Sequence, residues 1–278
     1  MFVHPALDKF TKLARQEHPE PSLFELSLLL AEGLGCQFDP DSCRAGMDRL
    51  EKGLRERLGN TSEPLLQLRI LARYLAGEEK FSGNRERYYE TDNSFLPRVL
   101  ETRQGIPISL SIISIELGRR MGLAIRGVGL PGHFVCSHEA AGRIFYFDPF
   151  HGWKTITRDE CVNLVQRLFG PGFEVTDDCF RPWSNRLIIE RSLRNLKGVY
   201  LSRGDLESAL KAVEFILAAM PDQGNEIRDR GLLRARLGKY GLAYEDLLRY
   251  LELSPGAPDL PQIQRELVRV KRQMETVN

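Results

Sequence analysis

Three residues in the middle of the chain have the types and the order that nucleophilic catalysis uses. Ser109 lies in "RQGIPISL", His133 in "LPGHFV" and Asp148 in "FYFDPF". A serine hydroxyl can attack a carbonyl carbon when a histidine removes its proton, and a carboxylate can hold that histidine in the correct tautomer. The sequence therefore supports the hypothesis of a Ser-His-Asp site that transfers or hydrolyses acyl groups.

Ser109 is expected in the first turn of a helix. Pro107 suits the first helical position, apolar residues recur at helical spacing from Ile108 to Met121, and Gly122 fits the C-terminal end. The unpaired N–H groups of a helix N-terminus stabilise a developing negative charge. The same position is also where serine commonly bonds the first amides of its own helix. Both roles stay open for Ser109.

The stretches 125–138 and 143–150 are rich in β-branched and aromatic residues and predict a β-hairpin. A four-residue loop, "EAAG", would set His133 directly opposite Asp148. This pair can serve as base and orienting carboxylate, or as a buried hydrogen bond that holds the hairpin to the core. Cys136 would point to the other face, because side chains alternate along a strand.

Other polar residues near this hairpin have several possible roles. His138 and His151 are potential metal ligands beside His133 and Asp148. However, His138 falls on the opposite face of the hairpin and His151 lies past the strand end. We therefore expect neither a metal nor another cofactor. The segment "RERYYETDNSF", which contains Asn93, can line a cleft beside these residues or pack its own loop down.

Composition and charge argue against several classes of partner. The chain has 39 Lys and Arg against 38 Asp and Glu, so its net charge of +1 provides no field for phosphate backbones or anionic lipid. Neither nucleic acid nor a membrane is expected as a partner. The chain shows no secretory signal and no apolar stretch long enough to span a bilayer. Five cysteines without a CxxC pair favour reduced thiols, and we expect a cytoplasmic protein.

The N-terminal third of the chain is expected to be helical. A capping box that starts at Ser22 begins one helix, and amphipathic patterns predict two more over 41–58 and 64–75. A polar, turn-rich loop over 77–100 follows, leading into a short helix near Ser94. Loops of this length usually serve a function.

The last hundred residues contain an internal repeat. Three pairs of positions are separated by 34 residues: Gly204 and Gly238, Ala209 and Ala243, and Pro221 and Pro255. This is the period of tetratricopeptide repeats, although Lys197 replaces the small residue of the first unit and Arg234 the tyrosine of the second. A third amphipathic helix over 259–274 is expected to cap the stack. Such a short array can bind a peptide or protein, or dock on the preceding domain.

Three segments, "NSFLPRVLETRQGIPISLSIISIELGRRMGL", "GVGLPGHFV" and "FYFDPFHG", together with the repeats, resemble the SirB-type family of transglutaminase-like/TPR proteins. The resemblance covers nearly the whole chain. It implies an α+β fold with a papain-like, transglutaminase-like core and N-terminal helices, followed by an all-α tetratricopeptide (TPR) domain. The transglutaminase-like domain would span 1–182, with a helical lead-in over 1–76 and the core over 77–182. The TPR-like domain would span 183–278.

The resemblance also implies roles for individual residues. In similar enzymes a cysteine at a helix N-terminus is the nucleophile. That position falls on Ser109, the base on His133 and the orienting carboxylate on Asp148. By analogy with related thiol enzymes, Gln104 is a candidate oxyanion donor, although it can equally be a solvated loop amide, and Asn93 is a cleft candidate.

The exchange of cysteine for serine decides between two functions. A serine hydroxyl is hardly ionised at neutral pH, so the exchange removes the thiolate that such enzymes use. We therefore expect a catalytically impaired protein that binds a protein or peptide through its cleft and repeats, in a regulatory role. The alternative is an active Ser-His-Asp hydrolase or acyltransferase that acts on amide bonds.

Overall fold

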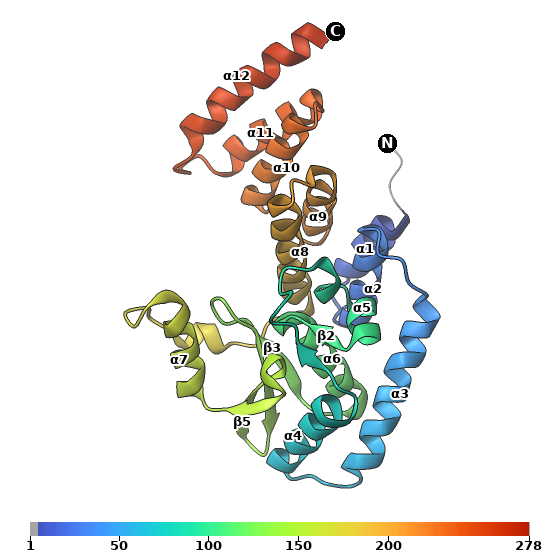
Figure 1. The fold of residues 1–278 in the computed structure, drawn as a ribbon. Helices are drawn as coiled ribbons and strands as arrows, with labels where there is room; N and C mark the ends of the chain where they lie inside the picture. Colours follow the sequence, from blue (N-terminus) through green and yellow to red (C-terminus); the bar gives the residue numbers. More distant parts are fainter. Residues whose placement is uncertain (1–4, 278) are drawn as a thin grey trace. The chain divides into compact units, whose positions relative to one another are not determined.

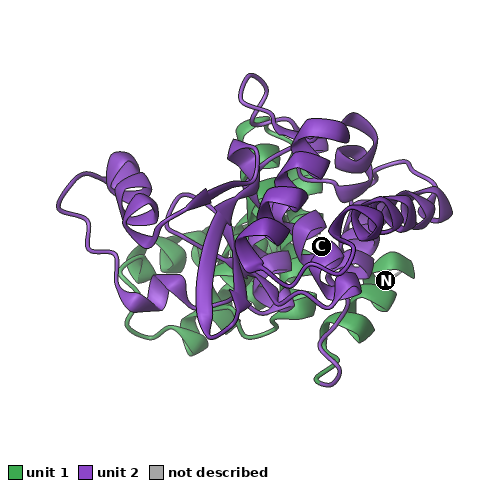
Figure 2. Ribbon diagram, turned by 90° about the horizontal axis from the view of Figure 1, so that it is seen from below, with its two compact units in different colours: residues 1–17, 193–278 green, residues 18–192 purple. Residues whose placement is uncertain are grey.

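The computed structural model describes residues 5–277 (Figure 1). Contacts between residues divide the chain into two compact units (Figure 2). His18–Ser192 forms the first, here called the core unit, and the described parts of Met1–Glu17 and Leu193–Asn278 form the second, here called the repeat unit. The units divide after residues 17 and 192 and not at residue 182, because the N-terminal helix belongs with the repeats and the long helix over 185–202 crosses the second boundary.

The core unit begins with three helices: α2 (Leu23–Gly33), α3 (Pro40–Leu58) and α4 (Pro64–Ala72). Ser22 is the N-cap of α2, since its hydroxyl accepts the backbone N–H of Glu25 at 3.3 Å. A π-helical turn, η1 (Arg73–Glu78), continues α4. No helix in residues 5–277 is long and apolar enough to cross a membrane.

The region expected as a polar loop contains short regular elements. β1 (Ser82–Gly83) pairs in parallel with β2 (Gln104–Gly105), and a 3-10 turn, η2 (Thr91–Asn93), precedes α5 (Leu96–Thr102). The helix expected near Ser94 thus begins at Leu96, where a proline occupies its first turn. The parallel pair holds the start of this region, at β1, beside the residues that follow α5, at β2.

A four-stranded antiparallel sheet forms the centre of the core unit. Its strands follow in chain order: β3 (Ile125–Val128), β4 (Val135–Ala140), β5 (Arg143–Asp148) and β6 (Lys154–Ile156). Helix α6 (Pro107–Met121) packs on one face, where Cys136 Sγ lies 4.0 Å from the backbone oxygen of Ser111. Helix α7 (Arg158–Phe169) packs Cys161 and Val165 against Val135 on the other. Helices on both faces explain why β4 is buried on both sides.

The predicted register of the hairpin is wrong by two residues. The turn between β4 and β5 contains only Ala141 and Gly142, with φ of 52° and 69°. Two central residues at positive φ suit the right-handed twist of a hairpin better than a longer loop does. Cys136 therefore pairs with Phe147 instead of Phe145. Because side chains alternate with a period of two, this shift leaves every side chain on its predicted face.

The repeat unit is all-helical. It contains α1 (Pro5–Ala14), the C-terminal part of α8 (Asn185–Ser202), α9 (Leu206–Ala219), α10 (Gly224–Arg236), α11 (Tyr240–Leu253) and α12 (Leu260–Val277). Helix α1 packs against α9, with the rings of Phe10 and Phe215 4.9 Å apart. Arg15 Nε also donates to the backbone oxygen of Ala218 at 2.9 Å. The N-terminal helix is therefore an integral part of the repeat unit.

Buried ion pairs occupy the two positions that depart from the repeat pattern. Lys197, which is 12% exposed, lies 2.7 Å from Glu226 and 2.9 Å from Asp229. Arg234 lies 2.8 Å from Asp246. Burying a charge is costly unless an opposite charge and hydrogen bonds accompany it. The two departures from the repeat are thus each matched by an acidic residue on a neighbouring turn or helix.

Candidate functional site

Ser109 is the third residue of α6 and is 1% exposed. Its Oγ donates to the backbone oxygen of Asn93 at 2.6 Å, with the oxygen of Ile106 at 3.1 Å as a second acceptor. The same Oγ accepts the backbone N–H of Ile106 at 3.0 Å. A hydroxyl carries one proton. The hydroxyl of Ser109 therefore donates its one hydrogen bond to a backbone carbonyl oxygen.

His133 and Asp148 meet beside the hairpin. His133 lies just before β4, and its Nε2 is 2.7 Å from Oδ2 of Asp148; the two side chains are 8% and 2% exposed. The carboxylate accepts a proton, so Nε2 carries the hydrogen and Nδ1 is left as the basic nitrogen. No hydrogen bond joins Nδ1 to another residue within 5–277. The pair has the tautomer that a general base requires.

His151 is a third member of this group, which the sequence prediction left outside it. Its Nδ1 lies 2.7 Å from the same Oδ2 of Asp148, and Oδ1 of Asp148 accepts the backbone N–H groups of Phe150 and His151. Burial would raise the pKa of Asp148, but hydrogen bonds and charges of His133 and His151 outweigh burial and lower the pKa below its usual value. Asp148 is therefore held as a carboxylate between two imidazoles.

The sequence contains a local signal for the placement of His151. "DPFH" has an aspartate at the N-cap of a short turn and a proline directly after it, and this pattern returns the chain towards the aspartate. The 3-10 turn η3 (Pro149–His151) forms there, so His151 lies three residues after its carboxylate partner. The sequence prediction extended the strand to Phe150 and so missed this relation; β5 ends at Asp148.

His133, Asp148 and His151 could also hold a metal ion. One ligand atom of each lies within 4.8 Å of the others, and two imidazoles with a carboxylate suit zinc or another transition metal. Nε2 of His133 and Nδ1 of His151, the nitrogens nearest the carboxylate, each donate to Oδ2 at 2.7 Å. A bound metal would have to replace both of these protons, so the geometry fits a hydrogen-bonded group better than a metal site.

The hydrogen bonds do not connect Ser109 with His133. Within residues 5–277, Ser109 Oγ bonds only to the backbone of Asn93 and Ile106, and the His133 ring bonds only to Asp148. The ring of Phe150 lies 6.3 Å from that of His133, in an edge-to-face arrangement. Hydrogen bonds therefore join two of the three predicted residues, His133 and Asp148, while the serine has separate hydrogen-bond partners.

Asn93 uses its side chain to hold its own loop. The buried amide donates to the backbone oxygen of Arg87 at 2.5 Å and accepts from Nδ2 of Asn84 at 3.0 Å. Its backbone oxygen accepts the hydroxyl of Ser109. Of the two roles that the sequence left open for this segment, these bonds correspond to packing of the loop, and they join the loop to the start of α6.

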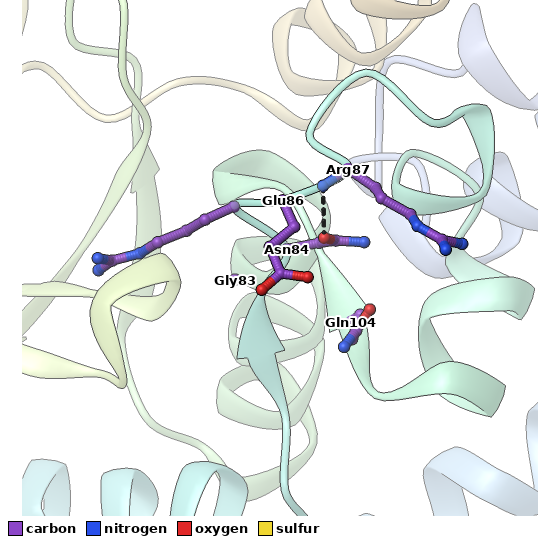
Figure 3. Close-up of a pocket in the computed structure, with 6 residues that line it drawn as sticks. Gly83, Asn84, Glu86, Arg87 and Gln104 are labelled. Carbon is purple, nitrogen blue, oxygen red and sulfur yellow. Dashed lines mark hydrogen bonds between the residues drawn. The ribbon is translucent and has the colours of Figure 1, made fainter.

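Gln104 lines a polar pocket of about 490 Å³. The other lining residues are the last residue of β1 and the four that follow it, all drawn in Figure 3: Gly83, Asn84, Arg85, Glu86 and Arg87. Asn84 accepts the backbone N–H of Arg87, the bond that is dashed in Figure 3. Phe150 connects this pocket to the histidines, since a Cβ on Gly83 would lie 2.5 Å from its ring.

His138, on the other face of β4, is buried and separate from this group. Its Nε2 lies 3.1 Å from Oε1 of Gln67, while its Nδ1 is buried without a hydrogen-bond partner in the described chain. Burial lowers the pKa of His138. Below pH 6.5 the unfolded chain therefore binds a proton that the folded chain does not, and stability falls as the pH falls.

We expect His138→Leu to remove this acid sensitivity. The wild-type free energy of unfolding should decrease from pH 7.5 to pH 5.0, and the variant should lose less over the same interval, as measured by urea denaturation at each pH. His18→Gln, which removes an exposed histidine, should behave like the wild type. Equal pH dependence of all three proteins would contradict the burial of a neutral His138.

Comparisons with known proteins agree with the architecture described above. Residues 41–194 match the transglutaminase-like superfamily and residues 196–268 match the tetratricopeptide repeat. A "UPF0162 protein" of Xylella fastidiosa (strain 9a5c) is 33% identical, with 94% of each chain covered. "Protein SirB1" of Salmonella typhimurium is 26% identical over 92% of this chain and 95% of its own. No solved structure matches the chain. The chain therefore belongs to the transglutaminase-like superfamily, within the SirB-type group whose core is followed by TPR repeats.

Proposed function

We propose that this chain is a transglutaminase-like protein without acyl-transfer activity, which binds a protein or peptide in a regulatory role. The observation that best supports this is the hydrogen bonding of Ser109. General-base catalysis requires the base within hydrogen-bond reach of the proton that it removes. The Ser109 hydroxyl instead donates its hydrogen bond to the backbone oxygen of Asn93, 2.6 Å from Oγ.

The residue type at this position supports the same conclusion. Superfamily enzymes that resemble this chain carry a cysteine where Ser109 stands, and a cysteine can be a thiolate beside a protonated histidine. Loss of a suitable nucleophile typically costs a factor of about 10³ or more in rate. The hydrogen bonds of Ser109 with Asn93 and Ile106 give this serine a structural role, because they close the first turn of α6.

The proposed binding role draws on both units. TPR repeats such as residues 196–268 present extended helical surfaces to other proteins. In the core unit, the polar pocket and the aromatic residues near His133 remain accessible although Ser109 is buried. The proposal includes a cytoplasmic location, in keeping with the five cysteines, which are all free thiols.

A serine-directed fluorophosphonate tests the loss of catalysis. We expect no mass adduct on Ser109 of the folded protein, and the same labelling for wild type and Ser109→Ala, because the hydroxyl is buried and donates to backbone oxygen instead of to a histidine. Ser109→Cys should react with iodoacetamide at pH 7 no faster than an ordinary buried thiol, measured by intact-mass spectrometry. An adduct on Ser109 that is absent from Ser109→Ala would establish the hydrolase alternative.

A further inference from the structure

Arg191 is a half-buried cation that has no acidic partner among the described residues. Within residues 5–277 its side chain contacts the backbone oxygens of Leu130 and His133, at 3.4 Å and 3.5 Å, and lies over the ring of Trp183 at 5.7 Å. Burial lowers the pKa of Arg191, with the charge of Tyr88 acting in the opposite direction. Arginines in such positions normally pair with a carboxylate or another anion.

Two arginines of the polar pocket, Arg85 and Arg87, also lack acidic partners in the described chain. The guanidinium of Arg85 lies 6.0 Å from the ring centroid of Phe150, and Arg87 forms no side-chain ion pair. Both line the polar pocket, in which Glu86 is the only carboxylate among the described lining residues. Other arginines of the core unit are neutralised by an acid, as Arg44 is by Glu25 at 2.9 Å. The pocket therefore carries an excess of positive charge.

Aromatic side chains connect Arg85 with Arg191. Tyr88 packs edge-to-face on Phe150 at 5.9 Å, and Phe150 packs likewise on His133 at 6.3 Å. Arg85 lies over Phe150, and Arg191 is within electrostatic range of Tyr88. Cations thus lie at both members of the Tyr88–Phe150 pair.

Exposed apolar side chains lie next to the same histidine. Leu168 and Phe169, at the C-terminal end of α7, are 57% and 52% exposed. They pack against Gly132, where an added Cβ would lie 2.8 Å from Leu168 and 2.9 Å from Phe169. Gly132 directly precedes His133. Large exposed apolar residues that cluster at one place commonly mark a binding surface.

We propose that Arg191 and Arg85, with the Tyr88–Phe150 pair between them, bind an acidic peptide segment of a partner protein. Carboxylates of the segment would pair with the two guanidiniums, and its apolar side chains would pack on the aromatic pair and on Leu168 and Phe169. Arginine binds carboxylates in a fork geometry that also fits phosphate. The apolar surroundings favour a polypeptide, because free phosphate has no apolar part to bury. This inference rests on the proposed binding function and specifies its ligand.

Fluorescence anisotropy with two labelled peptides tests the inference. The probe is a fluorescein-labelled ten-residue peptide of alternating Glu and Phe, and its neutral counterpart carries Gln in place of Glu. In 50 mM salt the full chain should bind the acidic probe at least about tenfold more tightly than the neutral one. Added salt should weaken this preference, because it screens the charges.

Three variants locate the binding. Arg191→Gln and Arg85→Gln should each weaken binding of the acidic probe by about tenfold. Arg69→Gln removes the same charge from the exposed surface of α4 and should change binding less than twofold. Arg85 is exposed, so Arg85→Gln remains informative if Arg191→Gln is less stable. Competition with inorganic phosphate at the same ionic strength should not displace the probe.

Several results would overturn the inference. Equal binding of the acidic and neutral probes would remove the role of the arginines but leave a peptide-binding cleft in place. Equal weakening by Arg69→Gln, Arg191→Gln and Arg85→Gln would show that the probe is attracted by the overall charge and not by a specific site. Displacement of the probe by phosphate would show that the arginines bind a small anion. Absence of binding by both probes would also count against it. None of these results bears on labelling of Ser109, which tests the loss of catalysis separately.

Discussion

Replacing Trp153 by alanine should lower the free energy of unfolding of the core unit by about 3–5 kcal/mol. Trp153 is among the largest fully buried side chains, and its indole N–H donates to Ser114 Oγ on α6 at 2.7 Å. Its ring also packs edge-to-face on Phe81, with centroids 6.4 Å apart. The substitution removes this packing and leaves a cavity between α6 and the residues that follow the turn η3.

Urea denaturation followed by far-UV circular dichroism measures this loss. Trp153→Phe is the matched control, because it retains an aromatic ring and loses only the hydrogen bond and part of the volume, which should cost about 1–2 kcal/mol. A loss below about 1 kcal/mol for Trp153→Ala would show that the ring does not fill the core as described.

Replacing Lys197 by methionine should destabilise the repeat unit by about 3–5 kcal/mol. Methionine keeps most of the length of lysine but removes its charge, so the carboxylate of Glu226, which is 1% exposed, loses its closest partner at 2.7 Å. The guanidinium of Arg194 stays at 3.4 Å and is too distant to replace it fully. An uncompensated buried charge costs far more than the lost attraction of an exposed pair.

A second variant separates charge from packing in this prediction. Lys197→Met combined with Glu226→Gln should recover a large part of the lost stability, because the fully buried carboxylate is then replaced by a neutral amide and Asp229 keeps Arg228 as a partner at 2.9 Å. Lys211→Met, an exposed position on α9, should change the free energy of unfolding by less than about 0.5 kcal/mol. If the double variant were as unstable as Lys197→Met alone, shape and not charge would explain the position of Lys197.

Much of the fold can be predicted from local patterns in the sequence. The capping residue Ser22, the helix after Pro107 and the period of the repeats each depend on neighbouring residues, and each corresponds to an element of the structure. The faces of the hairpin were also predictable, because alternation depends only on counting by two. Its register was not, since "EAAG" contains turn residues for both a four-residue and a two-residue connection.

The site was less predictable because it depends on contacts between distant segments. Residue types alone suggest a hydroxyl, a base and a carboxylate, but the direction of the Ser109 proton depends on a carbonyl 16 residues earlier in the chain. The placement of His151 has a local signal, the sequence "DPFH", but the strand was expected to continue to Phe150. Arg191, 58 residues after His133, has no pattern in the sequence that would connect it to the histidine.

The packing of α1 on α9 determines how this protein can be divided. A fragment that starts at Leu193 would carry every predicted repeat position from Lys197 onwards but would lack the ring of Phe10, leaving Phe215 open to solvent. Such a fragment should self-associate or be degraded, although it contains all of residues 196–268, which match the tetratricopeptide repeat. Proteolysis within residues 15–22 should likewise leave the first segment bound to the last, so that the two copurify after cleavage.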